Sequence, residues 1–235
     1  MDQTFDKMFY DKCQNLAGVD EVGVTALAGP IVAACVVLPR LDPHKDDISL
    51  FLIDDSKKIR EKYRYESART VKEHALAYGI GIVPPFEIDA LNTQVASNLA
   101  MKRAIDDCKK RFGDHALDFC LIDGNVEINL DIPHKLVVKG DLKSLSIAAA
   151  SVLAKVHRDQ IMKKYDSVNS LYGFASNKGY SCDTHFQGLD MGGIWVGVHR
   201  TSIFPLNKKK NETKEWTKRR REWVRQTAEN LHKGQ

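Results

Sequence analysis

Long apolar runs are missing from this chain of 235 residues, and with them the main sign of a membrane protein. A membrane-spanning helix needs about 18 or more consecutive apolar residues, and no stretch supplies them. The opening residues, MDQTFDKMFYDKCQ, are too polar and acidic for a secretory signal. The five cysteines are scattered without a CxxC pair, so neither a zinc knot nor a disulfide framework is expected. These absences together predict a cytoplasmic protein with reduced thiols and no membrane association.

A large charge imbalance is also lacking, since the formal net charge is only +4. The excess is local: residues 207–235 hold ten Lys or Arg and four Glu, which leaves residues 1–206 with a net charge of −2. A basic segment of this kind attracts phosphate polymers, but it is equally typical of a solvated helix face. We therefore predict two parts, a domain of residues 1–206 and a basic helical segment of residues 207–235.

The hydrophobic pattern predicts strands and helices in alternation. Strands are expected at residues 17–23, 31–38, 80–85, 116–125 and 134–141, and helices at residues 59–78, 86–112 and 142–165. We expect Gly79 to end the first of these helices. Beyond Tyr165 the sequence is rich in glycine, so loops are expected there, followed by a last helix near residues 212–232. This order is typical of an α/β fold in which helices flank a mixed central sheet, with a loop-rich and helical C-terminal part.

Acidic side chains occur at three places where the surrounding pattern is apolar. Asp20 and Glu21 stand side by side in a predicted strand, next to the loop VGVTALAGP. Asp123 ends the apolar run FCLI, and residues at strand ends line the ligand crevice of open α/β sheets. Asp159 lies in an Ala-rich helix. Carboxylates beside a future core are costly, so a cation or hydrogen bonds must compensate them.

Four carboxylates from two strand ends and one helix would form an oxygen-only site. Such donors suit Mg²⁺ or Mn²⁺, and no His/Cys cluster with zinc spacing competes. A pair of these ions can stabilise the attacking and leaving oxygens of a phosphodiester. Plainer interpretations remain open on spacing alone, because an Asp before Gly124 is also a common turn residue. Ser151, Lys155 and Asp159 share one helix face, where Lys155 and Asp159 would equally form a simple ion pair.

The motifs around these residues resemble those of the ribonuclease HII family. The family's opening motif, G-[IV]-D-E-x-G-R-G-P-x-x-G-P, is GVDEVGVTALAGP here. Its DSKK, EID-x-LN, A-x-x-x-AM-x-RA, IDG and SIAAAS-[IV]-LAKV-x-RD elements follow in the same order at residues 55–58, 87–92, 96–104, 122–124 and 146–159. KGY with a downstream His, and then HR-x-S, complete the series at residues 178–185 and 199–202. The resemblance covers residues 17–205.

The resemblance implies a ribonuclease H-like fold and a metal-dependent endonuclease that cuts the RNA strand of RNA–DNA hybrids. Cleavage would leave 3′-hydroxyl and 5′-phosphate ends, with Mg²⁺ or Mn²⁺ as cofactor, and cutting at ribonucleotides embedded in DNA is a further expectation. The family's four acids map onto Asp20, Glu21, Asp123 and Asp159, as catalytic residues and metal ligands. The positions expected to bind the substrate are Gly23, Val24, Thr25, Lys57, Lys58, Ser151, Lys155, Tyr180, His185 and Arg200.

The loop after Glu21 departs from the family pattern. The family's Gly-Arg-Gly, which surrounds the 2′-hydroxyl at an RNA–DNA junction, is Gly23-Val24-Thr25 here. Val24 offers neither the charge nor the donors of an arginine, and Thr25 adds a branched side chain where glycine lets the backbone approach closely. We therefore predict that hydrolysis is kept while recognition of a single embedded ribonucleotide is weakened.

Two other functions stay open on the sequence alone. One is a catalytically silent hybrid-binding protein, which the presence of all four acids disfavours. The other is a nuclease of this fold that acts on double-stranded RNA or structured DNA. The expected partner is an RNA–DNA hybrid or a ribonucleotide-containing duplex, and the chain itself is expected to be a monomer. Ribonuclease HIII carries an extra N-terminal substrate-binding domain, so the short stretch before the first strand favours ribonuclease HII.

Overall fold

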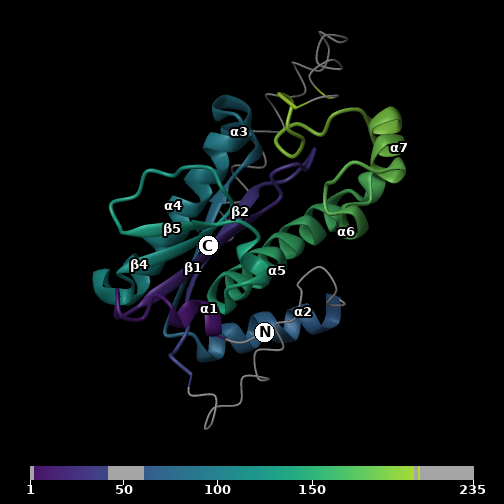
Figure 1. The fold of residues 1–235 in the computed structure, drawn as a ribbon. Coiled ribbons are helices and arrows are strands. Elements are labelled where there is room, and N and C mark those ends of the chain that lie inside the picture. Colours follow the sequence, from purple (N-terminus) through teal and green to yellow (C-terminus); the bar gives the residue numbers. More distant parts are fainter. Residues whose placement is uncertain (1–2, 42–60, 204–205, 207–235) are drawn as a thin grey trace.

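The structure, a computed structural model, describes residues 3–41, 61–203 and 206 (Figure 1). Within these residues the chain forms one five-stranded sheet with helices packed against it. Three predictions fall outside the described residues: the basic segment 207–235, its helix near residues 212–232, and the Lys57–Lys58 pair. No helix in the described part is both long and apolar enough to cross a membrane.

The sheet is mixed, with the strand order β3-β2-β1-β4-β5. The strands are β1 (Leu16–Val22), β2 (Ile31–Val37), β3 (Ala77–Val83), β4 (Phe119–Asp123) and β5 (His134–Val137). β1, β2 and β3 pair antiparallel in turn, whereas β4 runs parallel to β1, and β5 parallel to β4. Val19 of β1 is the partner of Ile122 of β4. The residues that follow them, Asp20 and Asp123, therefore reach the same end of the sheet.

Helices cover both faces of this sheet (Figure 1). The helices of the described residues are α1 (Thr4–Lys7), α2 (Glu61–His74), α3 (Pro85–Leu91), α4 (Thr93–Phe112), α5 (Leu145–Val168), α6 (Phe174–Asn177) and α7 (Asp183–Gly192). One face packs against α4, and the opposite face packs against α5 and α2. β2 is buried along its whole length, with odd-numbered residues toward α4 and even-numbered residues toward α5 and α2. An apolar run without alternation is the expected sequence of a strand that is covered on both faces.

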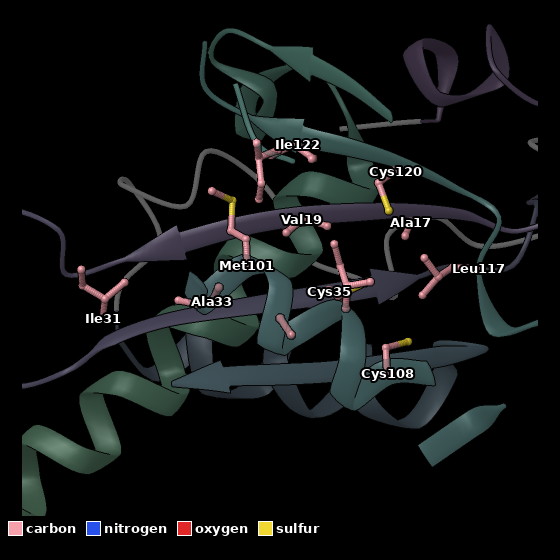
Figure 2. Packing of buried hydrophobic residues seen from close by; sticks show 14 of the residues in the cluster. Ala17, Val19, Ile31, Ala33, Cys35, Met101, Cys108, Leu117, Cys120 and Ile122 are labelled. Carbon is pink, nitrogen blue, oxygen red and sulfur yellow. The ribbon is translucent and has the colours of Figure 1, made fainter. Parts of the chain in front are cut away.

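The core on the α4 side is shown in Figure 2. Three buried cysteines, Cys35 of β2, Cys108 of α4 and Cys120 of β4, lie in it together with aliphatic side chains and Met101. Thiols behave there as small apolar groups, because burial removes them from water and from reagents. This core supports the back of the strands whose ends carry the acidic residues.

The structure corrects the predicted end of the first long helix. α2 ends at His74, and Gly79 lies inside β3 and so does not terminate a helix. A Cβ atom at Gly79 would lie 2.2 Å from the carbonyl oxygen of Ala104, and one at Gly81 would lie 1.9 Å from that of Ala100. These glycines therefore let α4 pack directly on the strand, a tertiary requirement that a local breaker rule does not reveal.

Two further differences concern helix boundaries. The predicted helix at residues 86–112 is divided at Asn92, which has a positive φ of 72° and whose side chain accepts hydrogen bonds from the first N–H groups of α4. Side-chain caps of this type begin a helix where the chain changes direction. Beyond Tyr165 the glycine-rich stretch contains loops, as expected, and also the helices α6 and α7.

Candidate active site

Asp20 and Glu21 are neighbours in β1 but face opposite sides of the sheet, because side chains alternate along a strand. Asp20 faces α5, where the Ser151 side chain is its hydrogen-bond partner, and Glu21 faces α4, where Ser97 takes that place. The N–H of Glu21 also donates to Oδ1 of Asp20 at 2.8 Å. Each carboxylate is thus held by a serine from a different helix, and Asp20 is buried.

Asp123 ends β4 at the same end of the sheet. Its Oδ1 atom accepts a hydrogen bond from the N–H of Gly140 at 2.6 Å. Gly124 follows with a φ of 110°, which a residue with a side chain rarely adopts, so the chain can turn away directly after the carboxylate. The negative charge of Asp123 raises the pKa of both Asp20 and Glu21, which shows that the three groups share one electrostatic environment.

Burial and mutual repulsion perturb these acids. Burial first, and the charge of Glu21 second, raise the pKa of Asp20 to about 8, although the Ser151 hydrogen bond and Lys155 act in the opposite direction. Burial and then Asp123 raise the pKa of Glu21. Carboxylates that oppose one another's ionisation are stabilised by an added cation. This end of the sheet is therefore short of positive charge.

Asp159, the fourth predicted acid, lies on α5, and its carboxylate forms an ion pair with Nη1 of Arg64 at 3.5 Å. In residues 3–41, 61–203 and 206, no three His, Cys, Asp or Glu side chains converge closely enough to form a ready metal cage. The four acids share one region of the fold, but they are not closed around a single point.

The polar face predicted on the Ala-rich helix lies on α5, as expected. Ser151 is fully buried, and Nζ of Lys155 donates to its Oγ atom at 2.7 Å. Since Ser151 also bonds Asp20, a continuous polar connection runs from Lys155 to the carboxylate. This arrangement orients Asp20 and places a cationic side chain next to the acidic group.

The loop that departs from the family pattern lies directly after the acidic strand. Gly23 has a φ of 89°, and a Cβ atom there would lie 2.2 Å from Nε of Arg158. Both the backbone conformation and the close approach of Arg158 therefore favour glycine at this position. Val24 is half-buried and Thr25 is exposed. Tyr180, half-buried, packs on Arg158, whose guanidinium lies 5.2 Å from the ring centroid. The side chains of Val24, Thr25 and Tyr180 thus stay partly accessible.

Arg200, a predicted substrate contact, is fully buried. Its Nε donates to the carbonyl oxygen of Gly29 and its Nη1 to that of Val24, each at 2.9 Å. The structure therefore places its guanidinium against the backbone of the loop at residues 23–30. Such contacts hold a loop in place, which differs from direct contact with a ligand.

His185, another predicted substrate contact, is also buried and bonds His199 through their Nε2 atoms at 3.0 Å. The N–H of Trp195 donates to Nδ1 of His199 at 2.8 Å, so the proton of His199 is assigned to Nε2. His185 then accepts at Nε2 and donates from Nδ1 to the carbonyl oxygen of Tyr180 at 2.9 Å. Burial lowers the pKa of both rings, that of His199 to about 3, with His185 contributing. A neutral histidine pair is therefore tied to the backbone at Tyr180.

Sequence reasoning missed three residues of this region: Ser97, Arg64 and Arg158. Ser97 was hidden in a helical stripe of apolar residues, where a small polar residue on the buried face was the available signal. Arg158 directly precedes Asp159 on α5, and it is 1% exposed. Its bonded partners are the carbonyl oxygens of Ala28, Pro30 and Lys178, so no neighbouring residue in the sequence indicates its role.

Comparison with known proteins identifies the family. The family described as ribonuclease HII matches residues 17–196. The chain belongs to the ribonuclease HII family. It is therefore a ribonuclease H, an endonuclease that hydrolyses phosphodiester bonds. A ribonuclease HII of Clostridioides difficile (strain 630) is 45% identical over 200 residues, which cover 85% of this chain and 74% of that protein.

Solved structures show the same fold as this ribonuclease HII. Ribonuclease H2 from Pyrococcus horikoshii OT3 aligns with a TM-score of 0.62 at 19% identity, over 83% of this chain and 96% of that one. Bst-RNase HIII in complex with Mn²⁺ aligns with a TM-score of 0.61 at 16% identity, over 83% of this chain and 68% of that one. The ribonuclease H-like fold predicted from the motifs is confirmed.

Proposed function

We propose that this enzyme uses a divalent cation to cut the RNA strand of RNA–DNA hybrids, leaving 3′-hydroxyl and 5′-phosphate ends. The proposal is carried by the acidic group at the end of the sheet, where burial and mutual repulsion raise the pKa of Asp20 to about 8. Membership of the ribonuclease HII family supports the hybrid as substrate. We place its action in the cytoplasm, in keeping with its free cysteines.

The donor chemistry of the acidic group fits a hard divalent cation. Asp20, Glu21 and Asp123 offer carboxylate oxygens only, which suits Mg²⁺ or Mn²⁺, and the similar Bst-RNase HIII was solved in complex with Mn²⁺. We propose these three residues as ligands, with Asp159 joining them once it separates from Arg64. A cation bound there supplies stabilisation of negative charge at the scissile phosphate.

The chain's own side chains prepare this site for a nucleic acid. The N–H of Gly140 fixes one oxygen of Asp123 at 2.6 Å, and the Lys155–Ser151 connection orients Asp20. Lys155 also places a positive charge beside the acids, where the phosphate backbone must approach. The partly accessible side chains of Val24, Thr25 and Tyr180 supply contacts next to the cut.

The test compares end-labelled duplexes cut by the intact protein in Mg²⁺, in Mn²⁺ and in EDTA. The substrates are a continuous RNA–DNA hybrid, DNA with one ribonucleotide, double-stranded RNA and double-stranded DNA. We expect cutting of the hybrid with either cation, none in EDTA, and a loss of about a hundredfold or more in kcat for Asp123→Asn. Products should carry 3′-hydroxyl ends, which polymerase extension detects.

Asp118→Asn is the matched control, because Asp118 lies just before the other end of β4. Its carboxylate accepts from the N–H groups of Gln14 and Asn15 at 2.9 and 3.0 Å, so both substitutions remove one strand-end carboxylate. The control should keep full activity. Tight hybrid binding without cutting by the unaltered chain would reject hydrolysis in favour of a silent binder. Equal cutting of double-stranded RNA would reject hybrid selectivity.

A further inference from the structure

The glycine loop, residues 23–30, runs between the tyrosine loop, residues 178–180, and the turn at residues 198–203. Two of its N–H groups donate to the carbonyl oxygen of Gly179, at 2.9 and 3.2 Å, and a third donates to that of Val198 at 2.8 Å. The loop is therefore bonded to a separate segment on each side. Its position depends on how firmly those segments are held.

Arg158 joins the glycine loop to the tyrosine loop through one buried side chain. Its Nε and Nη2 atoms donate to the carbonyl oxygens of Pro30 and Ala28, at 2.9 and 3.0 Å. Its Nη1 atom donates to the carbonyl oxygen of Lys178 at 2.8 Å, and its guanidinium packs on Tyr180. A guanidinium has a rigid planar fork of donors, so three such bonds fix the spacing of the two loops.

Arg200 holds the glycine loop from the other side. It bonds the carbonyl oxygen of Val24, within the stretch that replaces the family's Gly-Arg-Gly-Pro sequence, and that of Gly29, three residues after this stretch. Its Nη2 atom has no hydrogen-bond partner in the part of the chain that the structure describes. Burial, and next the charge of Arg158, lower its pKa to about 9. Keeping two cations buried this close is costly, so their geometry is a feature of the fold that must be maintained.

Asp89 of α3 sets the turn from which Arg200 reaches the loop. Its two carboxylate oxygens accept four hydrogen bonds, from the N–H and hydroxyl groups of Thr201 at 2.9 and 2.7 Å and from those of Ser202 at 2.9 and 2.7 Å. Charge-assisted bonds of this length are among the stronger ones in proteins. The turn is thus pinned to a helix, with Arg200 directly before it.

We propose that Arg158, Arg200 and Asp89 are positioning residues that set substrate selectivity by fixing Val24 and Thr25 relative to Tyr180. The proposal rests on the hybrid-cutting function proposed above and assigns Arg200 a role through the loop in place of direct contact. The acids are held separately, by the sheet and by the serines of α4 and α5. Substitutions that loosen the loops should therefore weaken substrate binding and make the position of the substrate less precise, while hydrolysis at the acids continues.

Two substitutions test this role in the intact chain. Asp89→Asn loses acceptors for the turn but leaves both arginines in place, and Arg200→Lys keeps the charge but loses the fork. We expect KM for the continuous hybrid to rise by about fivefold in the first and about tenfold in the second, with kcat within about twofold. The cut positions along the hybrid should spread over more sites in both variants.

Asp107→Asn is the matched control, because Asp107 of α4 is also a helix carboxylate that accepts from a backbone N–H, that of Ile80 at 2.9 Å. It pairs with Arg111 at 3.6 Å and has no contact with either loop among the described residues. This control should also lower the thermal midpoint, by less than Asp89→Asn because it loses fewer hydrogen bonds, without moving KM or the cut positions. Equal KM values and cut patterns in all three variants would overturn the proposal.

Amide hydrogen exchange gives a readout that does not depend on activity. We expect faster exchange in residues 23–30 and 178–180 in Asp89→Asn, but not in Asp107→Asn. An unaltered chain that cuts no hybrid would reject the proposed function, and the exchange difference would still establish the clamp on the loops. Unchanged exchange in Asp89→Asn would reject the clamp, even in an active hybrid-cutting enzyme.

Discussion

Two neighbouring regions of this enzyme bury charge in opposite ways. At the end of the sheet, Asp20 and Glu21 are each hydrogen-bonded to a serine, Asp20 also accepts from the N–H of Glu21, and neighbouring carboxylates raise the pKa of both. Beneath the loops, Arg158 and Arg200 are at least as deeply buried, but they donate to five backbone carbonyl groups in all. The two arginines are thus held by backbone carbonyl groups, although Nη2 of Arg200 has no partner among the described residues, whereas the acids lie close enough together for their charges to repel one another.

The difference separates the parts of the site that must stay rigid from the part that must accept a ligand. A hydrogen-bonded cation under a loop fixes geometry permanently, since breaking it leaves buried groups unpaired. A group of buried carboxylates that repel one another stores unfavourable energy, which a bound cation removes. Stability measured without a cation should therefore respond in opposite directions when the two regions are altered.

The largest expected effect is the loss of stability when a buried arginine is replaced. Arg158→Met removes three donors and leaves buried carbonyl oxygens unpaired, so we expect the free energy of unfolding to fall by about 3–5 kcal/mol. Chemical denaturation measures the change. Arg103→Met is the control, because Arg103 also donates to a carbonyl oxygen, that of Ile82 at 2.8 Å, but is 39% exposed. A loss below about 1 kcal/mol is expected there, and equal losses would contradict the distinction.

Removing one charge from the acidic group at the end of the sheet should raise the free energy of unfolding. In EDTA, we expect Asp20→Asn to raise the free energy of unfolding by about 2 kcal/mol at pH 8 or above. The unfolded chain releases this proton near pH 4, whereas the native pKa is about 8, so the unaltered protein loses stability as pH rises between those values. The gain should therefore be smaller at pH 5. Asp118→Asn should give no gain at either pH, and a matching gain would show that repulsion is not the cause.

The main elements of the fold and the candidate acids could be predicted because their signals are local. Apolar runs marked the strands, and Asp123 was recognisable as a strand-end residue before Gly124. The opposite facing of Asp20 and Glu21 also follows from strand alternation alone. The role of Gly79 could not be predicted in this way, because it depends on the approach of α4, a contact between distant segments.

The surroundings of the loops were beyond sequence reasoning for the same reason. His185 and Arg200 have the chemistry of substrate contacts, and only the packing of the loops shows that His185 bonds the backbone at Tyr180 and that Arg200 bonds residues 23–30. Ser97 and Arg158 gave weak signals because their partners, Glu21 and three backbone carbonyl groups, lie far away in the sequence. The metal-binding and substrate-binding roles of the candidate residues stay predictions for the experiments above.

Protonation of the His185–His199 pair should have a smaller effect on the stability of the loop region. Burial lowers the pKa of His199 to about 3, against about 6.5 in an unfolded chain, so protons bind the unfolded state first as pH falls. Stability should decline from about pH 6.5 downward, by about 1 kcal/mol between pH 7 and pH 5.5. Denaturation at the two pH values measures this. His199→Gln should reduce the dependence, and an unchanged slope would contradict the assignment to this pair.

The smallest expected effect is a change in substrate selectivity, from substitutions that leave both buried regions intact. Val24→Arg with Thr25→Gly restores the family's residues at positions whose side chains are half-buried and exposed, so the fold should accept both. Thr25 is not among the residues with positive φ, so glycine is needed there only for close approach of the substrate. We expect the ratio of cutting at a lone ribonucleotide to cutting of a continuous hybrid to rise by about fivefold, or roughly 1 kcal/mol.

Val24→Lys with Thr25→Gly is the control that separates the effect of charge from that of the planar guanidinium donors, because lysine supplies only a point charge. If the lysine version gains as much as the arginine version, electrostatic attraction sets selectivity here; if neither changes the ratio, the clamped geometry of the loop already determines where the enzyme cuts.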